Sequence, residues 1–168
     1  MKKILLVMMA ALAITMTADA QRKMSRDEQA NVMINFMRKF VPVDKRYAII
    51  NFPVTLYEYE AMTGTPVPYG KSVNNVAIVS GAEQKRVADE LTKADGQGIK
   101  YRVGTMGEAA AGSKVGVHGE LSQTSHVTKG FYIAISYNDY LKVEKMLKLI
   151  GEEDTPNAFS TGPIKVGR

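Results

Sequence analysis

The chain lacks several residue types, and each absence narrows what the protein can be. Its 168 residues include no cysteine and no tryptophan, and only two histidines. Without cysteine there is no disulfide, no thiolate nucleophile and no cysteine-ligated zinc. Stability must therefore come from packing, and we expect no metal ion, no cofactor and no catalytic residue.

A strong charge of one sign is also missing. The sequence has 22 Lys and Arg against 17 Asp and Glu, a formal net charge of +5 at pH 7, and the basic residues are scattered. Proteins that bind nucleic acids usually concentrate lysine and arginine in a dense patch. We therefore expect no nucleic-acid partner.

Apolar runs long enough to cross a membrane are absent. The chain opens with two lysines and an apolar run from Ile4 to Ala13, and small residues at Ala18 and Ala20 precede Gln21. This order is typical of a cleaved secretory signal peptide, and a stable membrane span needs about twenty apolar residues. We expect cleavage after Ala20 and a periplasmic or secreted mature protein that does not span the membrane.

Three helices are predicted from their start signals and apolar spacing. Ser25 and Ser80, each followed three residues later by glutamate, are capping boxes, and Ser136 caps the last helix. The first helix is expected to end at Pro42, the second at about Ala94 and the third at Gly151. Apolar residues recur at helical spacing in the first helix and form one apolar face. These residues are Val32, Met33, Phe36, Met37 and Phe40.

Short apolar runs predict strands at residues 46–52, 75–79, 99–103, 115–117 and 131–135, whereas residues 56–62 fit a strand or a short helix. Together these elements predict an α/β fold of the α+β kind, a compact single domain with helices packed on a mixed β-sheet. We divide the chain into a signal peptide (1–20), this domain (21–151) and a flexible C-terminal tail (152–168).

The order of these elements resembles that of the YfiR-like family of exported regulators. The similar segments are Asn35 to Pro42, Val76 to Val79, Tyr101 to Gly104, Ala111 to Val115, Phe131 to Ile133 and Leu141 to Val143. The tryptophan and cysteines common in that family are missing here. The resemblance implies a periplasmic protein that holds a membrane diguanylate cyclase inactive through protein contact, and thereby controls cyclic-di-GMP.

Three segments invite a catalytic or ligand-binding interpretation. Gly70-Lys71-Ser72 resembles the end of a phosphate-binding loop, but Gly64 is one residue too distant, and Pro66 and Pro68 lack the N–H groups that such a loop needs.

His118, Glu120 and His126 do not form a well-spaced set of metal ligands, so we expect surface or strand histidines. The glycine-rich stretch from Gly104 to Gly119 either binds an anion through its backbone or forms a turn, and we favour the turn.

Tyr57, Tyr59 and Tyr69 are the candidate partner surface, because tyrosine is enriched in interface hot spots; half-buried strand tyrosines are the alternative. The leading hypothesis is an exported, non-enzymatic regulator or binding protein whose partner is an envelope or inner-membrane signalling protein. A homodimer stays open. The alternative is a structural module associated with the envelope or with peptidoglycan, and for a small hydrolase the sequence offers no site.

Overall fold

The computed structural model describes residues 24–68, 70–115 and 127–153 of the chain. The predicted signal peptide, His118, Glu120, His126 and nearly all of the predicted tail lie outside these residues. The elements in chain order are α2 (Arg26–Met37), β1 (Phe40–Pro42), β2 (Tyr47–Ile50), α3 (Leu56–Thr63), α4 (Gly81–Ala94), β3 (Tyr101–Val103), α5 (Met106–Ser113), β4 (Ile133–Ser136) and α6 (Tyr137–Glu153). No helix in the described ranges is both long enough and apolar enough to cross a membrane.

The described strands form one four-stranded sheet in the order β1-β2-β4-β3, and all neighbours are antiparallel. The predicted fold class, a compact α+β domain with helices packed on a sheet, is confirmed, but a mixed sheet was expected. β1 and β2 are joined by a tight hairpin, where Asp44 accepts a hydrogen bond of 2.7 Å from the backbone N–H of Arg46. A connection this short can only link antiparallel strands.

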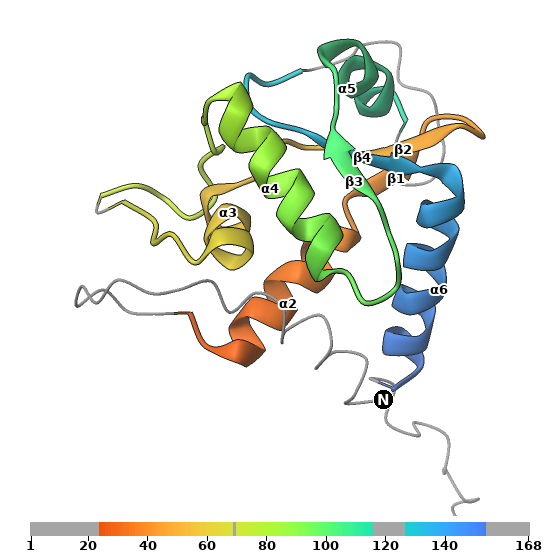
Figure 1. The fold of residues 1–168 in the computed structure, drawn as a ribbon, viewed down its shortest axis with the longest axis horizontal. Helices are drawn as coiled ribbons and strands as arrows, with labels where there is room; N and C mark the ends of the chain where they lie inside the picture. Colours follow the sequence, from red (N-terminus) through yellow and green to blue (C-terminus); the bar gives the residue numbers. More distant parts are fainter. Residues whose placement is uncertain (1–23, 69, 116–126, 154–168) are drawn as a thin grey trace, which may run out of the picture.

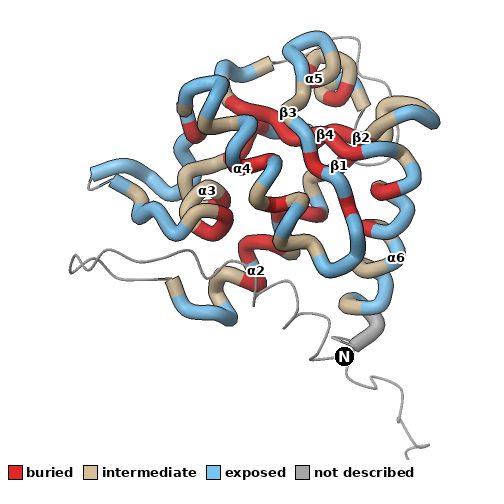
Figure 2. Tube along the Cα trace, viewed as in Figure 1, coloured by how far each residue is buried: buried red, intermediate tan, exposed pale blue. Residues whose placement is uncertain are grey.

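The two faces of the sheet carry different helices (Figure 1). Strand pairing puts Ala48, Ile135 and Tyr101 on one face. On that side Tyr101 reaches the sulfur of Met37 in α2, and the figure places α4 and α6 there as well. Ile49 lies on the opposite face, against Gly112 of α5. The sheet is therefore buried between two layers of helix, and Figure 2 shows the buried residues running through its strands.

The first helix is shorter than predicted. It ends at Met37, and Phe40 and Pro42 belong to strand β1. Val41 precedes a proline, which disfavours the helical region for that residue and favours an extended chain. Phe36 and Phe40 nevertheless meet edge to face, with ring centroids 5.5 Å apart, and both are buried.

The ambiguous segment at 56–62 is helix α3, opened by a capping box between Thr55 and Glu58. The predicted strand at 75–79 is wrong, because only Val76 makes a β-bridge, to Thr55. The segment after Gly104 contains a helix, α5, where we expected a loop. A capping box between Thr105 and Glu108 starts that helix, so its first turn is satisfied locally.

Candidate functional site

Two of the three tyrosines of the predicted partner surface lie on α3, and Tyr69 lies outside the described residues. Tyr57 and Tyr59 are half-buried and pack against the core. The Tyr57 hydroxyl donates a hydrogen bond to the Glu28 carboxylate in α2, and the Tyr59 hydroxyl donates one of 2.6 Å to Glu83 in α4. Both side chains therefore link α3 to its neighbouring helices. They are half-buried, as in the alternative interpretation, but they lie on a helix and not on a strand.

Glu83 joins α3 to α4 through Tyr59 and is also paired with an arginine of its own helix. Glu83 accepts hydrogen bonds from the Arg86 guanidinium at 2.7 and 3.0 Å, as well as the bond from Tyr59. Arg86, and then Tyr59, lower the pKa of Glu83 to about 2. Burial, and then the bond to Glu83, raise the pKa of Tyr59 to about 12. The phenol thus stays protonated at neutral pH and serves as a hydrogen-bond donor.

A buried ion pair holds the other side of α3. The Lys39 ammonium lies 2.8 and 3.0 Å from the two carboxylate oxygens of Glu58 and donates to the carbonyl of Pro53 at 3.0 Å. The pKa of Lys39 is lowered by burial, which Glu58 opposes. The same carboxylate accepts from the backbone N–H of Thr55 at 2.9 Å. Glu58 thus bonds to Lys39 and to Thr55, and it has a structural role in fixing α3 to the residue that precedes β1.

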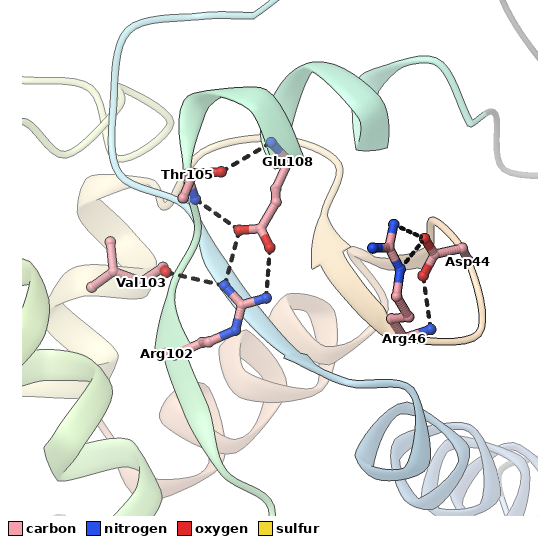
Figure 3. A network of polar contacts seen from close by, with 6 residues as sticks. All are labelled: Asp44, Arg46, Arg102, Val103, Thr105 and Glu108. Atoms are coloured by element: carbon pink, nitrogen blue, oxygen red, sulfur yellow. Dashed lines mark hydrogen bonds and ion pairs between the residues drawn. The ribbon is translucent and has the colours of Figure 1, made fainter.

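The second face of the sheet carries a network of the same kind (Figure 3). Arg102 of β3 forms two parallel hydrogen bonds with Glu108 of α5, at 2.7 and 2.9 Å, and its guanidinium lies 5.8 Å from the centre of the Tyr47 ring. Glu108 also closes the capping box with Thr105. Arg102 is the largest cause that lowers the pKa of Glu108 to about 2.

One pattern unites these contacts. Each described helix begins with Ser or Thr followed three residues later by an acid, and each acid also binds a segment outside its own helix. The five pairs are Ser25–Glu28, Thr55–Glu58, Ser80–Glu83, Thr105–Glu108 and Ser136–Asp139. We call these five acids the capping carboxylates. Four of the carboxylates accept a hydrogen bond at the start of their own helix, and Glu83 is the exception. All five also bond to a second segment, so all five act in the architecture.

The start of α4 differs from the sequence prediction, because its capping box is not reciprocal. The sequence predicts a reciprocal capping box between Ser80 and Glu83, and Ser80 does accept from the Glu83 N–H at 3.3 Å. The Glu83 carboxylate turns away to Tyr59 and Arg86 and makes no return bond to Ser80. Competition from an arginine and a tyrosine explains the difference, since hydrogen bonds between charged groups are the stronger ones.

An open depression lies beside the edge strand β3, between that strand and α4. Its volume is about 390 Å³, and it is lined by Gly81, Gln84, Lys85, Ala88, Asp89, Tyr101, Arg102 and Val103. Lys85 and Asp89 pair with each other at 2.5 Å, and Arg102 is bound to Glu108. Within the described residues no three His, Cys, Asp or Glu side chains are grouped as a metal site needs.

The remaining sequence motifs are placed only in part. Lys71 follows a turn in which its N–H donates to the carbonyl of Pro68, and the chain continues from Ser72 toward Val79 without a helix. This is not the strand-to-helix context of a phosphate-binding loop. Gly104 and Gly112 were expected in a turn, but they lie where the backbone of β3 and α5 approaches Ile49. An anion bound by the backbone would lie at the start of α5, and there the Glu108 carboxylate already accepts the N–H of Thr105.

The comparisons with known proteins identify no relative: no family model, no curated protein and no solved structure matches the chain. The resemblance to the YfiR-like family therefore stays a prediction.

Sequence reasoning missed the polar network, although part of its signal is visible. Thr55-x-x-Glu58 and Thr105-x-x-Glu108 have the spacing of a capping box and could have been identified. The partners of these acids, Lys39 and Arg102, are distant in sequence and leave no local pattern.

Proposed function

We propose that this protein is an exported, non-enzymatic regulator that works by binding another protein. The proposed partner is an inner-membrane or envelope signalling protein, with a membrane diguanylate cyclase as the first candidate. The start of the sequence supports export, and the order of its elements supports the regulatory role.

The observation that carries the proposal is the use of the capping carboxylates. The carboxylates of Glu58 and Glu108 are each bound by a cation and by a backbone N–H at the start of their own helix. The carboxylate of Glu83 is bound by the Arg86 guanidinium and by the Tyr59 hydroxyl. An acid or base that takes part in catalysis needs a tuned pKa and access to a substrate. Carboxylates fixed in this way favour a rigid scaffold that presents surfaces to a partner.

The alternative is a structural module of the envelope or of peptidoglycan. The rigid α+β scaffold suits that role as well, because it too requires no chemistry. The two functions differ in their effect on cyclic-di-GMP, since only the regulator acts on a signalling enzyme.

The test is deletion of the gene, with cyclic-di-GMP measured in the cells. Deletion should raise the nucleotide level, the full chain should restore it, and a chain without residues 2–20 should not. In parallel, the tagged full chain should capture an inner-membrane signalling protein from the envelope. Unchanged cyclic-di-GMP together with no such capture contradicts the regulator and supports the structural module.

A further inference from the structure

The described part of the fold has three extended segments with an outer edge, and two of these edges are partly closed. Strand edges with unpaired backbone groups promote pairing with other chains, so proteins usually block them. At β1, Pro42 stands on the outer side and has no N–H to offer. At β3, the Thr92 hydroxyl accepts from the Tyr101 N–H at 2.9 Å, and its single proton is directed to the carbonyls of Ala88 at 3.0 Å and Tyr101 at 3.2 Å.

The third edge, the segment from Asn75 to Val79, is open. The N–H of Ala77 bonds to the carbonyl of Val54, and the carbonyl of Asn75 accepts from Leu56, around the bridge between Thr55 and Val76. Backbone groups of alternate residues in an extended chain point to opposite sides, so those of Val76 and Ile78 point outward. Among the described residues these four groups have no hydrogen-bond partner.

The surroundings of this edge also favour pairing. Ile78 is 70% exposed, more than any other large hydrophobic residue in the described part. The segment leads into α4 along the margin of the molecule (Figure 1). No charged residue occurs between Lys71 and Glu83. Charges are a usual means of protecting an edge, and this edge has none of its own.

We propose that the 75–79 edge is a homodimer interface, in which two copies of the chain pair antiparallel about a two-fold axis at Ala77. In this register Val76 of one copy lies opposite Ile78 of the other. All four outward backbone groups of each copy are then hydrogen-bonded. The inference does not depend on the proposed function.

The charged residues that flank the 75–79 edge favour a second copy of the chain as the partner that pairs with it. Antiparallel pairing directs the Lys71 end of one copy toward the Glu83 end of the other copy. The charged residues nearest to the paired segment therefore have opposite signs in the two copies. No like charges face each other along the paired residues. The contact is small, and small interfaces are usually weak, so the dimer forms at high protein concentration.

The test is the concentration dependence of the mass of the full mature chain, measured by sedimentation equilibrium. The wild type should shift from the monomer mass toward twice that mass. Ile78→Pro removes one outward N–H and suits an extended chain, and Ile78→Lys adds a charge to the edge; both should lose the shift. Ile78→Val should keep it, as should Met106→Lys, which changes another exposed apolar residue.

Amide hydrogen exchange provides a second measurement that does not depend on any variant. Exchange at Val76 and Ile78 should slow as the protein concentration rises, whereas exchange at Met106 should not change. The proposal is overturned by a monomer at every concentration, by a dimer that persists in Ile78→Pro and Ile78→Lys, or by exchange at Val76 and Ile78 that does not depend on concentration.

Discussion

At the scale of single residues, two glycines allow close packing against the same isoleucine. A Cβ at Gly112 would lie 2.4 Å from Cγ2 of Ile49, and one at Gly104 would lie 2.6 Å from Cδ1 of Ile49. Cδ1 is the flexible end of the side chain, whereas Cγ2 is fixed close to the backbone. The two glycines should therefore respond differently to the same substitution.

We predict that Gly112→Ala lowers the free energy of unfolding by about 1–3 kcal/mol and Gly104→Ala by less, because overpacking a core costs about that much. Ile49→Val removes Cδ1 but keeps Cγ2. Added to Gly104→Ala, it should remove the clash; added to Gly112→Ala, it should not. Urea unfolding of the four variants measures this, and equal rescue of both glycine variants contradicts the packing.

The buried pair of Lys39 and Glu58 leads to a second prediction at this scale. Glu58→Ala should lower the free energy of unfolding by about 3–5 kcal/mol, because it leaves the Lys39 ammonium buried without its partner. Removing both charges with Lys39→Met and Glu58→Gln should restore much of that loss, since the glutamine still accepts from Thr55. A double variant as unstable as Glu58→Ala would show that the unpaired charge is not the cause.

At the scale of elements, one hydroxyl covers the outward backbone N–H of Tyr101 on the edge strand β3. Thr92→Val keeps the shape of the side chain but leaves the N–H of Tyr101 without its partner. Leaving a buried donor unsatisfied costs about 1–3 kcal/mol. We expect thermal unfolding to show a loss of that size for Thr92→Val and a smaller one for Thr92→Ser, which keeps a hydroxyl. Equal stability of the wild type and Thr92→Val contradicts the role of this hydroxyl.

The same scale shows what local sequence can predict. The starts of α2 and α4 are predicted by a serine with an acid three residues later, and the start of α6 by its serine cap. The apolar faces of these helices are predicted by the helical spacing of their apolar residues. α3 is only eight residues long and alternates apolar and polar residues, as a strand does. α5 contains Gly107 and Gly112, which disfavour a helix, and Gly112 is explained only by the distant Ile49.

The candidate site was predictable to a smaller extent. Tyr57 and Tyr59 were singled out for their residue type, but their exposure depends on α2 and α4, which supply Glu28 and Glu83. The open edge at residues 75–79 was expected to be a buried strand from its apolar run. Burial depends on the neighbouring elements, and in the structure only Ala77 of Ala77, Ile78 and Val79 is buried.

At the scale of the whole molecule, export is the first prediction to test. The mature chain should begin at Gln21, because the apolar run and the small residues at Ala18 and Ala20 have the order of a cleaved signal. Amino-terminal sequencing of protein from the envelope fraction measures this. An intact Met1 start on protein from the cytosol contradicts export, and with it the proposed envelope partner.

The central structural claim is that the capping carboxylates hold the helices to the sheet and to one another. The charged forms of Glu83 and Glu108 are stabilised in the folded protein, and their pKa values fall from 4.5 to about 2. The largest cause is Arg86 of the same helix for Glu83 and Arg102 of β3 for Glu108. A lowered pKa contributes stability that is fully present above the unfolded value and is lost as pH falls toward the folded value. We therefore expect unfolding to become easier between about pH 4.5 and pH 2.

The most direct test is an NMR titration of the side-chain carboxyl groups in the folded mature protein. At about pH 3.5 the account predicts that Glu83 and Glu108 are still ionised, whereas an unperturbed glutamate is mostly protonated there. Arg86→Gln and Arg102→Gln serve as matched variants, each raising the pKa of one carboxyl and leaving the other unchanged. Titration of Glu83 and Glu108 near 4.5 in the wild type would contradict the claim.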